Sequence, residues 1–373
     1  MDKKILFIFL FLMSFGFSQT IGLTEDAKIS VLTVGTGNAS HELYGHTGIR
    51  IKDTARGIDV VFNYGFFDFN TPYFIAKFVK GDMQYFVANQ RYADFEYSYI
   101  MDNRSIYEQE IALNLKQKNA LYKNLNASLF SADKFYTYKF IDRNCTTKVI
   151  DQLNAVLGEK RITTNKPVVQ TYRDILNNTY LDKDYFTKFG INLIFGTKVD
   201  KVAATLFLPL ELHSVLQTAT FQGKPLTTKS KTIFEARKTT FKSSLLNSPY
   251  LIISLLVLLI LMRNKRLLNT YLILSGLLGV FLLAVGLYSF HQEVLWNYNA
   301  LLFNPLLLIL VNALRNRDAK KIITWGKINL VCVIVYLLLL VNKIDLMVFL
   351  PFIVAHFIIL YRIIIKYKKE ISY

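Results

Sequence analysis

The sequence predicts an α+β domain that is exported, followed by an all-α bundle of membrane helices. Three observations predict this: a short apolar segment at the start of the chain, a mixed polar region, and a series of long apolar runs near the end. Hydrophobic residues make up 52% of the 373 residues, a high share for a soluble enzyme. We therefore expect a signal peptide at 1–18, an exported domain at 19–245 and a transmembrane region at 249–369.

The first 18 residues have the layout of a signal peptide. Lys3 and Lys4 supply the charged start, residues 5–15 supply the apolar stretch, and Gly16 and Ser18 supply small residues before cleavage. The alternative is an uncleaved anchor, but the apolar stretch is shorter than the roughly 20 residues that cross a bilayer. The segment predicts export of the domain that follows.

About five apolar spans are expected after residue 245. They lie near 249–262, 267–290, 294–314, 322–342 and 345–365, and the first is short for a full crossing. Basic residues favour the cytoplasmic side of a membrane. They gather after the first, third and fifth spans: Arg263, Lys265, Arg266, Arg315, Arg317, Lys320, Lys321, Arg362, Lys366, Lys368 and Lys369. This bias places the domain in the periplasm and, because outer membranes are dominated by barrels, the spans in the inner membrane.

The formal net charge of +17 agrees with a membrane protein better than with a nucleic-acid-binding protein. No zinc-finger spacing, phosphate-binding glycine loop or basic helix accompanies the charge. Histidines and carboxylates lack the spacing of metal ligands. We expect no nucleic-acid partner, no metal and no cofactor.

The exported region mixes strands and helices in blocks, which is typical of an α+β fold. Alternation of apolar and polar residues predicts strands at 29–34, 46–52 and 59–64, and an aromatic strand at 135–141. A helix is expected from Cys145 to near Gly158, and further helical segments near 106–130 and 168–178.

Cys145 is the best candidate nucleophile. The second cysteine, Cys332, lies in an apolar run, so a disulfide would have to join the domain to the bilayer interior, and Cys145 is predicted to be a free thiol. Asn144 is a good helix N-cap, and Val149 and Leu153 share a buried helical face with the cysteine. A helix N-terminus favours the thiolate. The alternative is a buried structural cysteine.

A thiolate nucleophile needs a base, which is usually histidine. Of the three histidines in the exported region, His46 begins a predicted strand after a glycine-marked loop and is preferred; His41 lies in that loop, and His213 is interpreted as a surface residue. A third group should orient the imidazole. Asn63 and Tyr64 on the next strand are both candidates.

Two further features have open interpretations. Arg173 is a candidate for binding a lipid headgroup or phosphate, with an ordinary salt bridge as the alternative. Residues 71–87 combine aromatic residues with lysines. They would line an acyl groove, rest on the bilayer surface, or form a helix packed on the sheet.

The combined motifs resemble the exported domain of the Lnb family of bacterial lipoprotein N-acyltransferases. The matching elements are His41 with Gly45-His46-Thr47-Gly48, Asn63-Tyr64-Gly65, and Asn144-Cys145-Thr146-Thr147, within residues 29 to 220 or so. The resemblance implies that Cys145 forms a thioester with His46 as base, moving an acyl chain from a membrane phospholipid to the N-terminal amine of a lipoprotein. His41, Asn144 and Arg173 are the residues that we expect near the substrates.

The order of histidine before cysteine also resembles the circularly permuted papain-like group, which includes lecithin–retinol acyltransferase. The resemblance therefore implies a permuted papain-like fold for the exported domain. Two other functions fit the residues: a membrane-anchored cysteine peptidase or amidase of the cell envelope, and an envelope protein that binds a partner without catalysis.

Overall fold

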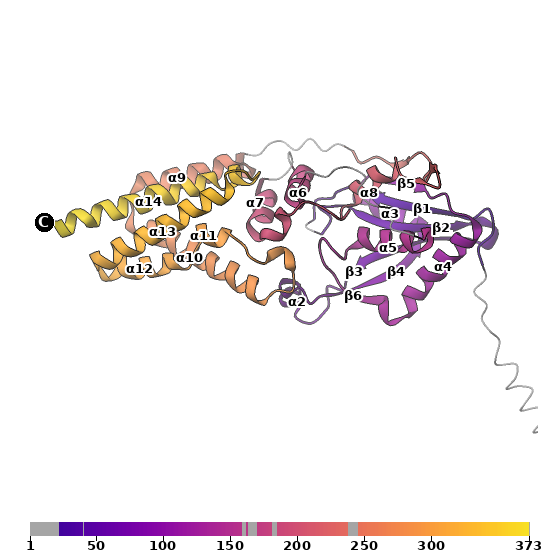
Figure 1. Ribbon diagram of the computed structural model, residues 1–373, viewed down its shortest axis with the longest axis horizontal. Helices are drawn as coiled ribbons and strands as arrows, with labels where there is room; N and C mark the ends of the chain where they lie inside the picture. Colours follow the sequence, from indigo (N-terminus) through magenta and orange to yellow (C-terminus); the bar gives the residue numbers. More distant parts are fainter. Residues whose placement is uncertain are drawn as a thin grey trace, which may run out of the picture.

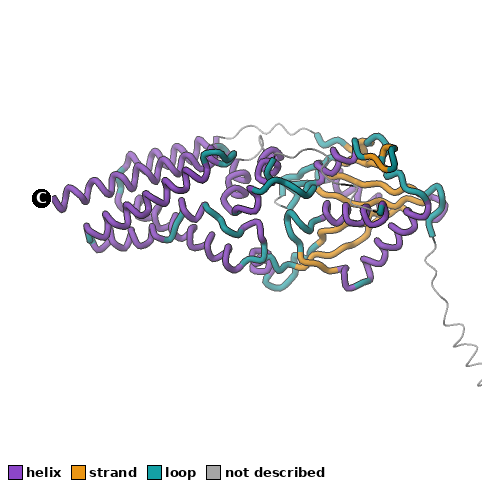
Figure 2. The backbone as a smooth tube through the Cα atoms, in the orientation of Figure 1, coloured by secondary structure: helices purple, strands orange, loops and turns teal. Residues whose placement is uncertain are grey.

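The computed structural model describes residues 22–39, 41–158, 162, 170–180, 185–237 and 245–372. The molecule is elongated, with a sheet-rich domain at one end and a helix bundle at the other, where the chain ends (Figures 1 and 2). The α+β fold class is confirmed. The predicted signal peptide at 1–18 lies outside the described residues. The limits 19–245 and 249–369 stay a proposal; the last described strand before the bundle ends at Phe234 and the first long helix begins at Pro249.

A seven-stranded sheet forms the core of the domain. Its strand order is β6-β4-β3-β2-β1-β5-β9, and each neighbouring pair is antiparallel. The strands are β1 (Lys28–Val34), β2 (His46–Asp53), β3 (Ile58–Phe66), β4 (Gln84–Arg91), β5 (Ile106–Glu110), β6 (Phe135–Thr137) and β9 (Lys231–Phe234); β7 (Thr220–Phe221) and β8 (Lys224–Pro225) form a separate hairpin.

The three predicted strands at 29–34, 46–52 and 59–64 are confirmed as β1, β2 and β3. The predicted aromatic strand at 135–141 is wrong beyond Thr137. There the chain leaves the sheet and turns, with a bridge between Lys139 and Arg143, to reach the helix that begins at Cys145. The expected helical stretch at 106–130 divides into a strand followed by a helix from Leu115.

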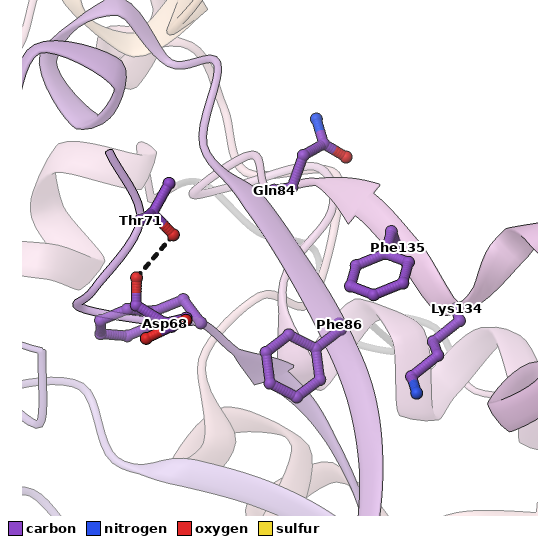
Figure 3. Close-up of a pocket in the computed structure, with 7 residues that line it drawn as sticks. Asp68, Thr71, Gln84, Phe86, Lys134 and Phe135 are labelled. Carbon is purple, nitrogen blue, oxygen red and sulfur yellow. Dashed lines mark hydrogen bonds between the residues drawn. The ribbon is translucent and has the colours of Figure 1, made fainter. Parts of the chain in front are cut away.

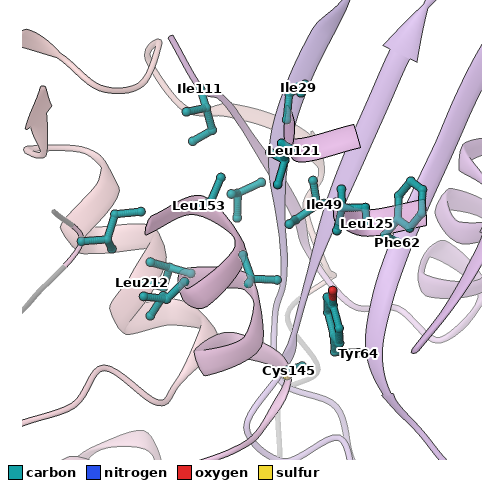
Figure 4. Close-up of a cluster of buried hydrophobic side chains, with 14 of the residues drawn as sticks. Ile29, Ile49, Phe62, Tyr64, Ile111, Leu121, Leu125, Cys145, Leu153 and Leu212 are labelled. Carbon is teal, nitrogen blue, oxygen red and sulfur yellow. The ribbon is translucent and has the colours of Figure 1, made fainter. Parts of the chain in front are cut away.

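Helices cover both faces of the sheet. On one face, α4 (Leu115–Phe130), α5 (Cys145–Leu157) and α8 (Pro209–Leu216) enclose the largest apolar cluster (Figure 4). On the other face, α3 (Tyr92–Met101) packs on a smaller cluster that includes Leu32, Val61 and Phe95. Successive residues of a strand face opposite sides, so the side chains of β2 and β3 are shared between these two layers.

The predicted helix from Cys145 to near Gly158 is confirmed as α5. A capping box starts it: the Asn144 side chain accepts from the Thr147 backbone N–H, and the Thr147 hydroxyl accepts from the Asn144 N–H. Gly158 ends the helix with φ +85°, a left-handed conformation that suits glycine. Val149, Leu153 and other apolar residues of α5 are buried against the sheet.

The bundle consists of α9 (Pro249–Met262), α10 (Lys265–Tyr288), α11 (Asn299–Leu302), α12 (Leu306–Asn316), α13 (Ala319–Leu340) and α14 (Leu346–Ser372). Four stretches of the described chain are long and apolar enough to cross a membrane, α11 and α12 counting as one. The first predicted span, 249–262, corresponds to α9, which has 14 residues. At 1.5 Å per residue it is roughly 21 Å long, less than the roughly 30 Å of a hydrocarbon core.

The predicted third span, 294–314, begins later than expected, at Asn299, and is interrupted between Leu302 and Leu306. Two asparagines explain the late start. Asn297 and Asn299 donate to backbone carbonyls of α7 (Tyr185–Ile194), including that of Leu193, so this stretch belongs to the junction with the domain.

Chain direction agrees with the charge pattern. One end of the bundle lies away from the sheet and contains the loops at 263–264 and 317–318 and the C-terminal end of α14 (Figure 1). A basic cluster is found at each of these three places. The opposite loops touch the domain: Lys139 donates to the carbonyl of Phe290, and Lys343 pairs with Asp200. The sheet domain therefore lies on the side that the basic residues avoid.

A buried polar network joins the domain to the bundle. Arg173, on α6 (Tyr172–Tyr180), donates to Asp200 at 2.6 Å, to Asn192 at 3.1 Å and to two backbone carbonyls. It also lies 3.6 Å from Asp345 in the loop before α14. Burial raises the pKa of Asp345, and the nearby Arg173 guanidinium opposes that rise. Because Arg173 is buried, with its guanidinium nitrogens engaged, the expected headgroup role is replaced by a structural one.

Replacing Arg173 with Met should destabilise the protein. The change leaves Asp200 and Asp345 without their common cation, and breaking a buried ion pair costs about 3 to 5 kcal/mol. Thermal unfolding of the detergent-solubilised protein should show a clear fall in the melting temperature. The control is Arg91→Met, which removes an exposed pair with Asp94. Equal melting of the two variants would contradict the structural role of Arg173.

Candidate active site

Cys145 is the first residue of α5 and lies where this helix meets β2 and the end of β3. Its residue is 9% exposed and its thiol is free. Figure 4 shows it at the margin of the apolar cluster, near Tyr64. The hydroxyls of Thr47 on β2 and Thr146 on α5 lie 3.1 Å apart and tie the first turn of the helix to the sheet. The thiol is therefore held in a fixed place.

His46 is the first residue of β2 and its imidazole interacts with the thiol. Its Nε2 lies 3.0 Å from Oδ1 of Asn63. The Asn63 amide nitrogen donates to the carbonyl of Val61, which leaves Oδ1 as the acceptor facing the ring. Nε2 therefore carries the proton of the neutral ring, and Nδ1 is the basic nitrogen. Such an arrangement suits an imidazole that removes a proton from a thiol.

Two opposing influences set the pKa of the Cys145 thiol. Burial raises it, because a thiolate is poorly solvated there. The hydrogen bond and charge of His46, the backbone N–H of Thr47 and the hydroxyl of Thr146 lower it, and together they hold the thiol pKa below its usual range. A lower pKa makes the nucleophilic thiolate more abundant at neutral pH.

Gly65 shapes the strand beside the thiol. It lies in a bulge of β3, between Asn63 and Phe66, and has φ +95°. Residues with a Cβ rarely adopt this left-handed backbone conformation, whereas glycine adopts it readily. A Cβ at position 65 would also lie 3.8 Å from the Cβ of Cys145. The glycine lets the end of β3 bend next to the first turn of α5.

Of the two candidates for the group that orients His46, the structure brings only Asn63 to the ring. Tyr64 follows it on β3, so its side chain leaves the opposite face of the sheet. Its hydroxyl lies 3.3 Å from the hydroxyl of Ser128 on α4, and the residue is buried in the large apolar cluster. The expectation that Tyr64 contributes to the site is therefore corrected, whereas Asn63 stays a candidate.

Three tyrosines near the thiol were not anticipated. Tyr99 on α3 stacks on His46 with ring centroids 6.2 Å apart. Tyr136 and Tyr138 belong to the aromatic segment before Cys145. Burial raises the pKa of all three phenols, and a negative charge at Cys145 raises it further. They therefore keep their protons at neutral pH. The alternation of Tyr136 and Tyr138 just before the cysteine was a signal that could have identified them.

The two other residues expected near the substrates differ in their surroundings. His41 lies in an exposed loop, with its ring 6.2 Å from both Phe67 and Phe69. Asn144 is buried and its amide nitrogen donates to the carbonyls of Phe140 and Phe207, while its oxygen caps α5. Its side chain is fully used by the fold, so the expected substrate contact through Asn144 is corrected to a structural role.

A pocket of about 570 Å³ lies beside β4 and β6, at one edge of the sheet. Figure 3 shows Asp68 and Thr71 on one side of it and Phe86, Lys134 and Phe135 on the other; Phe67 and Gln84 complete the lining. Its volume is in the range of pockets that hold small molecules. The ring of Phe67 also lies 5.2 Å from Tyr85, which stacks on Tyr138 at 4.4 Å. Aromatic contacts thus connect the pocket wall with the surroundings of the thiol.

Comparison with known families accounts for both parts of the chain. Residues 23–178 match the family model of the Lnb N-terminal periplasmic domain, and residues 240–370 match that of the Lnb transmembrane domain. The chain belongs to the Lnb family. It is a membrane protein with a periplasmic domain, and His46, Asn63 and Cys145 all lie within the first match. No curated protein matches the chain. No solved structure matches it either.

The reactivity of Cys145 should depend on pH in a way that reports His46. Since only the thiolate reacts with iodoacetamide, the alkylation rate falls as pH drops through the thiol pKa. In the intact protein the inflection should lie below that of free cysteine. His46→Ala removes the imidazole but not the burial, so the inflection should move to higher pH. Mass spectrometry of the Cys145 peptide measures the rate at each pH.

Tyr64→Phe is the matched control, because its hydroxyl faces α4 and not the imidazole. Its alkylation profile should follow that of the parent protein. An unchanged inflection in His46→Ala would show that the imidazole does not govern the thiol.

Proposed function

We propose that this protein is a cysteine-dependent lipoprotein N-acyltransferase of the inner membrane. It would move an acyl chain from a membrane phospholipid to the N-terminal amine of a bacterial lipoprotein through a thioester on Cys145. One observation carries the proposal: a thiol of lowered pKa interacts with an imidazole whose other nitrogen is fixed by Asn63. Membership of the Lnb family and the attached membrane bundle support it.

In the first half-reaction the thiolate of Cys145 attacks the carbonyl carbon of a phospholipid ester. The C–S bond forms and the C–O bond to glycerol breaks. His46, which has taken the thiol proton on Nδ1, gives it to the departing alkoxide, so the lysophospholipid leaves neutral at that oxygen. Asn63 accepts the Nε2–H throughout and keeps the ring in place.

In the second half-reaction a neutral amine attacks the thioester. The C–N bond forms, the C–S bond breaks, and the thiolate of Cys145 is restored. His46 takes the proton that the amine loses. The conversion of a thioester to an amide is downhill, so the second step needs no additional energy source. Atoms and charges balance without an oxidant or a reductant.

The start of α5 supplies a site for the oxyanion of each tetrahedral intermediate. The first N–H groups of a helix have no acceptor within the helix. The cap uses that of Thr147, which leaves those of Cys145 and Thr146 beside the sulfur. The tyrosines that keep their protons, Tyr136 and Tyr138, are additional donors near the thiol. Donors fixed before the reaction stabilise developing charge most effectively.

Lipid substrates fit the surroundings better than cell-wall peptides. A single span would anchor an enzyme, yet the chain devotes a whole bundle to the membrane. Phenylalanine and tyrosine rings, including Phe67 and Tyr85, form contacts that lead to Tyr138 near the thiol, whereas a peptidase would need a polar cleft. Trapping of an acyl group on the sulfur separates the transferase from a non-catalytic binding protein, and the identity of the acceptor separates it from a peptidase or amidase.

The decisive experiment looks for the thioester and the product together. Purified protein in phospholipid vesicles should acquire an acyl group on Cys145, which neutral hydroxylamine releases. Addition of a diacylated lipopeptide should then yield the triacylated form. Cys145→Ser should lose the hydroxylamine-sensitive adduct, and His46→Ala should slow transfer about 10² to 10⁴-fold, the usual contribution of a general base. Mass spectrometry of both molecules provides the measurement.

Absence of any acyl group on Cys145 under these conditions, with the lipopeptide still converted, would remove the thioester from the mechanism. Release of a peptide or ammonia in place of acyl transfer would favour the amidase.

Asn63→Leu should affect transfer selectively. The substitution keeps a similar volume but removes the acceptor at Nε2, so the imidazole loses its fixed tautomer. We expect the transfer rate to fall at least tenfold while the melting temperature of the protein changes far less than with Arg173→Met. The partner variant Tyr64→Phe should keep its transfer rate. If both variants transfer equally well, Asn63 does not orient the base.

A further inference from the structure

The short helix α2 (Phe74–Lys80) lies at the level where the bundle leaves the membrane. Three hydrogen bonds attach it to the chain just after α10: Ser289 donates to the carbonyl of Val79, the Phe290 N–H donates to the carbonyl of Lys80, and His291 Nε2 lies 2.9 Å from the carbonyl of Phe78. Figure 1 shows α2 beside this end of α10. Because α10 is a membrane-spanning candidate that ends at Tyr288, α2 lies at the bilayer surface.

Gly81 makes this docking close. It ends α2 with φ +73°, and a Cβ there would lie 2.9 Å from the backbone nitrogen of His291. The backbone of the domain and the backbone after α10 are therefore in direct contact. This contact fixes the position of α2 relative to the membrane.

The outward side of α2 is apolar and is left exposed by the residues that the structure describes. Tyr73 is 83% exposed, Ile75 77% and Phe78 50%. Lys80 lies close to the rings of Tyr288 and Phe290 at the end of α10. Exposed aromatic and aliphatic residues mixed with lysines are characteristic of a helix at a membrane interface. The bilayer around α10 is the apolar medium that these side chains would meet first.

A continuous row of aromatic rings leads from α2 to the nucleophile. Consecutive ring centroids are 6.3 Å, 5.8 Å, 5.2 Å and 4.4 Å apart along Phe78, Phe74, Phe67, Tyr85 and Tyr138. The last ring lies in the neighbourhood of Cys145: a Cβ on Gly65 would lie 3.8 Å from both the Tyr138 ring and the Cβ of Cys145. The row thus joins the membrane side of the domain to the sulfur, and its members come from α2, the loop before it, β4 and the segment before α5.

We propose that α2 inserts into the periplasmic leaflet and that the aromatic row guides one acyl chain of a phospholipid from that leaflet to Cys145. The second half of this statement rests on the proposed function, because it assumes that the thiol receives an acyl group. The insertion of α2 into the leaflet does not depend on the proposed function. The apolar side chains of Ile75 and Phe78 displace headgroups, while Lys77 and Lys80 stay near lipid phosphates. The ester carbonyl of a phospholipid in this leaflet would then reach the sulfur by moving along the aromatic row.

The first test maps lipid contacts without using the reaction. Full-length Cys145→Ser protein is placed in vesicles that contain a phosphatidylethanolamine with a photoreactive diazirine in one acyl chain. After irradiation, mass spectrometry should find label on residues 66–80 and on β4 around Tyr85, in addition to the bundle. Label confined to α9 through α14 would overturn the proposal. Since this variant cannot form a thioester, the result is independent of whether the protein is an acyltransferase.

The second test compares two apolar-to-acidic variants. Ile75→Asp places a charge on the inserted side of α2. Met101→Asp makes the same kind of change at an exposed residue at the end of α3, on the layer that packs on the other face of the sheet. Ile75→Asp should lose photolabel at residues 66–80. It should also form the Cys145 thioester from vesicle lipid about tenfold more slowly, because the equilibrium constant for insertion of α2 into the leaflet falls by about a factor of ten. Met101→Asp should match the parent protein in both measurements.

A dispersed short-chain phospholipid separates lipid delivery from damage to the active site. With this donor, which does not have to leave a bilayer, Ile75→Asp should acylate Cys145 at the parent rate. Equal loss of rate with both donors would overturn the role of α2 in delivery. If the parent protein forms no thioester from any donor, the proposed function fails, whereas the photolabel of the Cys145→Ser protein still decides whether α2 enters the membrane.

Discussion

The chemistry that we propose for this protein depends on the interaction between the Cys145 thiol and the His46 imidazole. Burial opposes a negative charge on the sulfur, and without compensation the thiol would stay protonated and unreactive. The imidazole provides most of that compensation, with smaller contributions from the Thr47 N–H and the Thr146 hydroxyl. Since His46 and Thr47 lie on β2 whereas Cys145 and Thr146 lie on α5, the contact exists only when α5 is docked on the sheet.

The structure fixes that docking through backbone features as much as through side chains. The capping box of Asn144 and Thr147 defines where α5 begins, so the cysteine occupies the first position of the helix. The bulge at Gly65 bends β3 beside it. Asn144 therefore has a structural role in place of the expected one: it positions Cys145 by capping the helix, and its amide nitrogen is occupied by backbone carbonyls.

Sequence alone could predict the components of the site but not their distances. Cys145 and His46 were identifiable because each stands at the start of a regular element, and the periodicity of those elements is visible in the sequence. The choice between Asn63 and Tyr64 needed the faces of β3, since neighbouring strand residues point to opposite layers. A salt bridge was one of the two interpretations of Arg173, but its partners could not be identified, because Asp200 and Asp345 are 27 and 172 residues away along the chain. Periodicity carries no information about such pairs.

The connection between domain and bundle determines what the site can reach. Hydrogen bonds at α2, at Lys139 and at Asn297, together with the Arg173 network, attach the domain to both loops of the bundle that lie on its side. A thiol held in this way cannot swing far from the membrane surface, so the substrates that we propose would reach it along that surface. This restriction suits a phospholipid and an anchored lipoprotein, which both diffuse in the plane of the bilayer.

Burial of the thiol has a second consequence if a thioester is formed. Water in the periplasm would hydrolyse an exposed thioester and waste the acyl chain. Cys145 is only 9% exposed, so its sulfur has little contact with bulk water. The same desolvation raises the pKa of the thiol and protects the intermediate. A site that needs both a reactive sulfur and a long-lived thioester must therefore combine burial with nearby groups that stabilise the thiolate. Between β2, β3 and α5, Cys145 is buried and His46, Thr47 and Thr146 lower its pKa.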